Sequence, residues 1–227
     1  MDLREYYGFP EGSNVSLNFR PSFYDTVDSN YPCPADMSYA YSNYNGSVVK
    51  KLNTSNVTSM NYMFYASNKI DSIDVNGWDT SNVTSMNNMF YQCGIESIDL
   101  SSWDTSKVTN MDRMFYSNHN LESIGYMNCI SVAKDKYPIY NYSASATIKN
   151  LGGFYMRNSW VNTQGLTNCT GLTVESLVNV LNALYDFTGN GETPNSNEGK
   201  LALGATNLAK LTDEQKAIAT NKGWTLS

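Results

Sequence analysis

Hydrophobic and polar positions recur through the middle of the chain at intervals of 25 or 26 residues. Three copies of the pattern begin at Thr54, Thr80 and Thr105, and each joins a segment like TSNVTSMNNMFY to one like IESIDLSSWD. Leucine-rich repeats have periods of roughly 20–29 residues. The spacing therefore predicts an array of repeated units.

The first half of each copy predicts a short helix. Met60, Met63 and Phe64 are spaced by three and four residues, which places their side chains on one helical face. Thr58 stands two residues before Met60 and is a candidate N-cap. The corresponding positions in the next two copies are Met86, Met89, Phe90, Met111, Met114 and Phe115, with Thr84 and Thr109 as candidate caps.

The second half of each copy predicts a short strand. Ile73 and Val75 are two residues apart, as are the pairs Ile98–Leu100 and Ile124–Tyr126. One such unit cannot bury its apolar face alone, whereas stacked copies can. The predicted fold is an α/β repeat, a leucine-rich-repeat-like solenoid of short strands and short helices. In it Trp78 and Trp103 stack, and the repeated apolar residues form the core.

Three zones follow from this pattern. Residues 1–47 do not repeat and contain four prolines, so we expect a non-helical cap or an attachment segment that docks on another subunit. Residues 48–130 carry the short repeats. Residues 131–227 are expected to hold degenerate repeats and a C-terminal capping module with longer helices.

The C-terminal module contains the clearest helix signals. The segment TVESLVNVLNALYDF has one broad apolar face and Thr173 as its N-cap. Thr212 and Gln215 match a capping box that opens a second helix, and Gly223 fits the position after its end. The segments KLALG and WTLS are predicted as short strands, and residues 147–151 as another.

Composition and charge exclude some classes of function. Only 16% of residues are charged and the net charge is −6, which argues against nucleic acid as the main partner. No apolar run approaches the ~18 residues of a membrane span, and the first residues lack a signal-peptide pattern. The four cysteines form no CxxC pair and are expected to be free thiols.

The sequence offers no catalytic constellation, so we predict no enzyme activity, no catalytic residue and no cofactor. The single histidine, His119, lies in an expected turn. Asp186, Thr188 and Asn190 match the first, third and fifth positions of a calcium loop, but the twelfth position is Asn197 and Glu198 comes one residue late. A polar connecting loop is the preferred interpretation, and no metal is predicted.

Carboxylates recur instead in rows along the predicted strands. They suggest a ligand-facing surface, on the exposed side of the repeats, where solenoids bind their partners. The alternative is that these side chains only serve turns and caps. The predicted surface comprises Asp74, Asn76, Asp99, Ser101 and Tyr126.

The segments WDTSNVTSMNNMF and IDLSSWDTSKVTNMDRMF resemble BspA-like leucine-rich-repeat surface proteins, of the type found in gut bacteria and their phages. The resemblance covers about residues 48–130, and the C-terminal stretch is similar to the terminal module of such proteins. It implies a non-enzymatic adhesion or recognition role and carries over no catalytic residues. No resemblance is recognised for residues 1–47.

The leading hypothesis is a binding protein that presents its repeat surface to a host-cell glycan or protein, as a phage virion fibre or decoration component. The alternatives are a bacterial cell-surface adhesin and a structural virion subunit that packs against neighbours. Other virion subunits, contacted through residues 1–47, are a further expected partner class, and a homo-oligomer is among the expected assemblies. No nucleic acid or membrane insertion is expected. The expected location is the virion surface, or the extracellular or cell surface.

Overall fold

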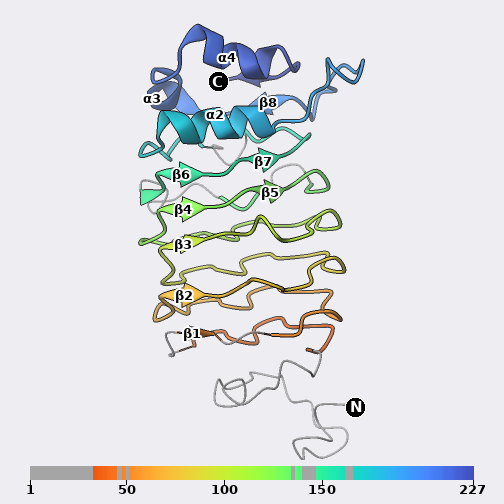
Figure 1. Ribbon diagram of the computed structural model, residues 1–227, viewed down its shortest axis with the longest axis vertical. Coiled ribbons are helices and arrows are strands. Elements are labelled where there is room, and N and C mark those ends of the chain that lie inside the picture. The colour runs from red at the N-terminus through yellow and green to blue at the C-terminus, as the bar shows by residue number, and fades with distance from the viewer. Residues whose placement is uncertain (1–32, 45–47, 50–51, 134–135, 140–146, 162–165) are drawn as a thin grey trace, which may run out of the picture.

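Successive passes of the chain lie across the molecule and stack along its long axis from the N-terminal to the C-terminal end (Figure 1). This computed structural model describes residues 33–44, 48–49, 52–133, 136–139, 147–161 and 166–227. Short parallel strand pairs join one pass to the next, for example with Ser97 opposite Ser123 and Ile98 opposite Ile124. The sheets are β1–β2, β3–β4–β6, β5–β7 and β8–β9. The strand bounds are β1 Val48–Val49, β2 Ser72–Ile73, β3 Ser97–Ile98, β4 Ser123–Ile124, β5 Met127–Asn128, β6 Asn150–Leu151, β7 Phe154–Tyr155, β8 Lys200–Leu201 and β9 Thr225–Leu226.

The prediction of short helices in the repeats is wrong. The segments around residues 60–64, 86–90 and 111–115 form consecutive β-turns instead. The N–H of Met63 donates to the carbonyl of Met60 (3.3 Å), and the N–H of Tyr65 donates to that of Tyr62 (3.0 Å). Tyr62 and Ala66 adopt φ of 56° and 57°, the left-handed region that a helix excludes. In consecutive turns, as in a helix, an apolar side chain points into the core about every third residue. The spacing of apolar residues is therefore the same in both structures.

The remaining N–H groups of these turns donate to the next repeat. Tyr62, Phe64 and Ala66 donate to the carbonyls of Asn87, Met89 and Tyr91, at 2.9, 2.8 and 2.8 Å. The same pattern joins the second repeat to the third. A helix would have satisfied these donors internally. Here the turns pair sideways as strands do, and the stacked copies satisfy each other's backbone groups.

This ladder of turns begins before the predicted boundary at residue 48. Asp36 bridges to Ser59 in parallel fashion, and the N–H of Met37 donates to the carbonyl of Ser59 (2.9 Å). Met37 and Tyr41 are buried at the positions that Met60 and Phe64 occupy one repeat later. The prediction that residues 1–47 stand apart from the repeats is therefore wrong for residues 33–44. Residues 1–32 and 45–47 lie outside the described residues.

The repeated apolar residues form the core, as predicted. Phe64, Phe90 and Phe115 stack in one column with ring centroids 5.4 and 5.5 Å apart. Trp78 and Trp103 form the expected stacked pair at 5.8 Å. All four cysteines are buried free thiols, which confirms that prediction.

The strand spacing of two residues would place Tyr126 on the buried side with Ile124. Instead Met127 is buried and Tyr126 is 39% exposed, which agrees with the place of Tyr126 in the predicted ligand-facing surface. The third repeat has one more residue than the second between its buried isoleucine and its next buried apolar residue. The chain accommodates this extra residue by turning Tyr126 outward.

The C-terminal module confirms the predicted long helices. α2 (Val174–Ala183) begins at Thr173, whose side chain accepts the N–H of Ser176. α4 (Asp213–Thr220) begins with the capping box of Thr212 and Gln215. A further short helix, α3 (Gly204–Leu208), was not predicted. Figure 1 shows these helices stacked across the end of the turn ladder. Among the described residues, no helix has both the length and the apolar character needed to cross a bilayer.

Candidate binding surface

The predicted strand surface is exposed, but its carboxylates serve local turns. Asp74 Oδ1 accepts the N–H of Asn76, and Asp99 Oδ1 accepts that of Ser101, each at 3.0 Å. Hydrogen bonds from the backbone and side chain of Ser101 hold the pKa of Asp99 below its usual range. These contacts match the turn-chemistry alternative.

The row of carboxylates also ends after two repeats. The position that follows Asp99 in the ladder is Gly125, and a Cβ there would lie 2.4 Å from Asp99 Oδ1. Tyr126 lies beside this glycine in the chain and is exposed. The five predicted residues therefore share one side of the molecule without forming a continuous row of like side chains.

Rows of stacked tyrosines lie on the turn side, where no site was predicted from the sequence. Five tyrosines form two adjacent columns, which together we call the tyrosine ladder. The column of Tyr65, Tyr91 and Tyr116 has centroid separations of 4.8 and 4.9 Å. Tyr39 stacks on Tyr62 at 4.7 Å, and Tyr62 tilts against Tyr65 at 5.7 Å. The members are Tyr39, Tyr62, Tyr65, Tyr91 and Tyr116.

The turns explain how the sequence builds this ladder. Tyr65, Tyr91 and Tyr116 each follow the buried phenylalanine of their repeat, so the backbone turns them away from the core. The signal in the sequence was the Phe-Tyr pair that recurs at the repeat period. The expectation of a helix hid it, because helices of successive repeats lie ~8–10 Å apart and would keep these rings too far apart to stack.

The ladder is partly exposed. The side chains of Tyr62, Tyr65 and Tyr91 are each half-buried. Beside them, Asn61 Oδ1 accepts the hydroxyl of Ser85 at 2.6 Å and the N–H of Asn87 at 2.9 Å. This surface therefore presents a fixed row of hydroxyl groups that can both donate and accept hydrogen bonds.

Two carboxylates lie near the ladder in the chain, and each has a partner. Asp36 accepts the N–H of Ser38 at 2.9 Å, and Asp112 lies 3.8 Å from the ammonium of Lys136. Burial, followed by the neighbouring phenols of Tyr62 and Tyr65, raises the pKa of Tyr39, which keeps its hydroxyl protonated. The exposed carboxylates of Asp71, Asp74, Glu96, Asp99 and Glu122 belong to the strand side instead.

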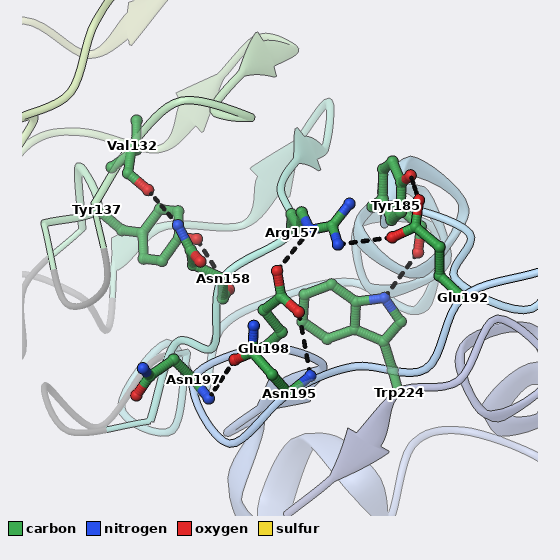
Figure 2. Close-up of polar contacts among 10 residues, drawn as sticks. All are labelled: Val132, Tyr137, Arg157, Asn158, Tyr185, Glu192, Asn195, Asn197, Glu198 and Trp224. Atoms are coloured by element: carbon green, nitrogen blue, oxygen red, sulfur yellow. Dashed lines mark hydrogen bonds and ion pairs between the residues drawn. The ribbon is translucent and has the colours of Figure 1, made fainter. Parts of the chain in front are cut away.

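Two glutamates come together at the C-terminal module, and Arg157 holds both (Figure 2). The guanidinium contacts Glu192 and Glu198 at 2.5 Å each and lies over the ring of Tyr185 at 4.8 Å. Hydrogen bonds from Arg157 and Tyr185 lower the pKa of Glu192. Burial raises the pKa of Glu198, but the hydrogen bond and ion pair from Arg157 outweigh it and lower the pKa. Two ionised carboxylates bound to one arginine are poorly suited to act as a general acid.

The calcium-loop residues do not converge. Asp186 Oδ1 accepts the N–H of Gly189 at 2.6 Å, and Asn190 donates its side-chain amide to the backbone carbonyl of Asp186 at 2.6 Å. Thr188 is exposed. Glu198, near the end of the same loop, is bound to Arg157. No group of three or more His, Cys, Asp or Glu side chains that could hold a metal occurs in the described part of the chain.

His119 lies exposed in a turn, as expected, with its ring nitrogen 3.4 Å from the hydroxyl of Ser117.

A family model described as "Mycoplasma protein of unknown function, DUF285" matches residues 35–154. The match begins at the first rung of the turn ladder and covers more than half of the chain. No curated protein and no solved structure matches the chain.

Proposed function

This chain belongs to the family described as Mycoplasma protein of unknown function, DUF285, and from that premise we propose that it is a non-enzymatic recognition protein. It binds a glycan or protein on the outside of a host cell along its stacked repeats. Within this proposal it resembles the BspA-like surface proteins, which use short repeats of the same kind for adhesion.

The tyrosine ladder is the observation that carries the proposal. Tyrosine offers a large, rigid and amphipathic contact at low cost in side-chain entropy, which is why binding surfaces are rich in it. Here stacking removes most of the remaining freedom before any ligand arrives. Preorganisation of this kind increases affinity, because less order has to be imposed on binding.

The state of the carboxylates supports a non-enzymatic role. Arg157 forms an ion pair with each member of the close pair Glu192 and Glu198, and both carboxylates stay ionised. Asp74 and Asp99 are engaged in turns at the protein surface. Neither set resembles the acid–base pair, with pKa values pushed apart, that hydrolytic enzymes use.

Placement on a phage virion, as a fibre or decoration component, and placement on a bacterial cell surface remain two versions of the same proposal. Both put the repeats outside a cell, facing a ligand. The family description names Mycoplasma, and this favours the cell-surface version.

The test is binding of the fluorescently labelled full chain to cultured epithelial cells and to intact gut bacterial cells. We expect saturable binding to at least one of them, which is lost in the variant Tyr65→Ser/Tyr91→Ser. The matched control, Asp74→Asn/Asp99→Asn, changes the strand side and keeps its turns, and it should bind as the unchanged protein does. Circular dichroism verifies that both variants are folded. The absence of saturable binding to every cell type contradicts the proposal.

A further inference from the structure

We infer that the ligand of the tyrosine ladder is a linear, neutral polysaccharide that lies along the row, across successive repeats. This inference rests on the proposed function and specifies its ligand. It follows from the spacing of the rings, from the state of the backbone beneath them and from the charge around them.

Ring spacing excludes recognition of proline-rich peptides. Grooves for polyproline helices hold the proline rings between separated aromatic side chains. In the ladder, Tyr65, Tyr91 and Tyr116 are stacked on one another at 4.8 and 4.9 Å. No proline ring fits between them, so a ligand meets the edges and hydroxyl groups of the rings.

The backbone of the ladder excludes addition of a peptide strand. Strand addition requires unpaired N–H and C=O groups at a sheet edge. The N–H groups of Tyr62, Phe64 and Ala66 already donate to the next repeat, and those of Asn88, Phe90 and Gln92 donate to the one after it. A ligand on this side therefore binds through side chains alone.

Hydroxyl groups in a straight row suit a chain of sugars. Each phenol oxygen can donate one hydrogen bond and accept others, and a polysaccharide offers hydroxyl and ether oxygens at regular intervals. The half-buried side chains of Tyr65 and Tyr91 belong to successive repeats and their stacked rings are inclined by 19°, so equivalent phenol hydroxyl groups recur along the axis. Beside them, the side chains of Asn61 and Asn87 are fixed by hydrogen bonds between repeats.

The charge of the surface favours a neutral ligand over an anionic one. The cations near the ladder are few: Arg113 and Lys69 are exposed, and Lys136 faces Asp112. Recognition of sulfated or phosphorylated chains uses clusters of arginine or lysine at the contact. The ladder itself consists of uncharged phenols.

The inference is tested with an array of linear glycans of increasing length, which includes neutral and sulfated chains, and an array of extended and proline-rich peptides. We expect retention on one neutral glycan, with the hexasaccharide bound about tenfold more tightly than the disaccharide, because it spans more repeats. The variant Tyr65→Phe/Tyr91→Phe removes two hydroxyl groups and keeps the stacked rings. Its affinity for the hexasaccharide, measured by calorimetry, should fall about tenfold or more.

Tyr126→Phe is the matched control, because it removes an exposed phenol hydroxyl from the strand side, and its affinity should not change. Failure of every neutral glycan to bind, or equal affinity of Tyr65→Phe/Tyr91→Phe, overturns the inference. If cell binding persists, requires the ladder, and is abolished by protease but not by glycosidases, the proposed function stands and the ligand is a protein. If cell binding is absent altogether, the proposed function itself fails.

Discussion

The rings of Tyr65 and Tyr91 lie face to face, with centroids 4.8 Å apart and planes inclined by 19°, although the two residues belong to successive repeats. The N–H of Ala66, next to Tyr65, donates to the carbonyl of Tyr91 at 2.8 Å. Paired backbones set neighbouring chains ~4.7–4.9 Å apart, which is also a favourable stacking distance. The ladder is therefore a direct consequence of the turn-to-turn hydrogen bonds.

Replacement of the middle ring tests this coupling. Tyr91→Ala removes stacking contacts with Tyr65 and Tyr116 and should lower the free energy of unfolding by about 1–2 kcal/mol. Tyr91→Phe keeps the ring and should change it by less than about 0.5 kcal/mol. Urea denaturation followed by circular dichroism measures both. Equal values for the two variants would show that the stacked rings contribute nothing.

Asn118 tests the side-chain hydrogen bonds between the second and third repeats. Its buried side chain accepts the N–H of Cys93 at 2.6 Å and donates to the carbonyl of Phe90 at 2.8 Å. Asn118→Ala leaves both backbone groups without that partner and should cost about 1–3 kcal/mol of stability in urea denaturation. The nearby exposed Asn120→Ala is the control and should be nearly neutral. A neutral Asn118→Ala would show that these backbone groups find other partners.

Gly153 tests the packing of α2 on the end of the ladder. Its φ is 108°, and a Cβ there would lie 2.7 Å from the carbonyl oxygen of Asn179 and 2.8 Å from Cβ of Ala183. Gly153→Ala should therefore destabilise the protein by about 2–4 kcal/mol. Gly191→Ala is the control, since it also has positive φ but meets nothing within 4 Å, and it should cost about 1 kcal/mol. Similar losses in thermal or urea unfolding would mean that α2 does not approach Gly153 closely.

The ion pairs of Arg157 make the stability of the folded protein depend on pH. The pKa values of Glu192 and Glu198 are lowered in the folded state. Their contribution is therefore complete above the unfolded-state pKa of ~4.3 and is lost as the pH falls through the lower folded-state values. Arg157→Gln should lower the melting temperature at pH 7, and its difference from the unchanged protein should shrink on acidification below about pH 4.

The control for this cluster is Lys216→Gln, which removes the surface pair with the 99% exposed carboxylate of Asp213. Surface pairs contribute little, so its melting temperature should hardly change. A difference for Arg157→Gln that stays constant from pH 7 to pH 3 contradicts the assigned ion pairs.

Thiol reactivity tests the burial of the cysteines. Burial raises the pKa of Cys33 and of Cys93 to about 11, and it raises that of Cys129 further. We expect iodoacetamide at pH 7.5 to leave Cys93 and Cys129 unmodified in the folded protein and to modify them in urea, as mass spectrometry of peptides will show. Rapid modification of Cys129 without denaturant would contradict its place in the core.

The period, the core residues and the capped helices could be read from the sequence, because each depends on local chemistry or on simple recurrence. Thr173 and Thr212 cap their helices as their sequence context predicts. The turns could not be read in this way. Spacing of three and four residues is shared by a helix and by a chain of β-turns, and the choice depends on hydrogen bonds to the next repeat.

The candidate surface was missed for the same reason. Helices of successive repeats would lie ~8–10 Å apart, too far for their tyrosine rings to stack, whereas paired turns bring the rings of Tyr65 and Tyr91 to 4.8 Å. Asp74 and Asp99 were predicted to face a ligand because carboxylates recur in rows along the predicted strands. Their role as turn acceptors depends on backbone geometry that the sequence does not display.

The uniform direction of the turn-to-turn hydrogen bonds has a consequence for how such a molecule changes in size. Through its turns, each of the first two repeats donates N–H groups to the following one, whereas other N–H groups, such as those of Thr84 and Gly125, donate back to the preceding repeat, at Thr58 and Ile98. The boundaries between these repeats are built alike, so one whole copy can be inserted or removed without creating an interface of a new kind. Each such step lengthens or shortens the column of Tyr65, Tyr91 and Tyr116 by one ring. The reach of the molecule along a polymer, and its avidity, would thus vary in increments of one repeat.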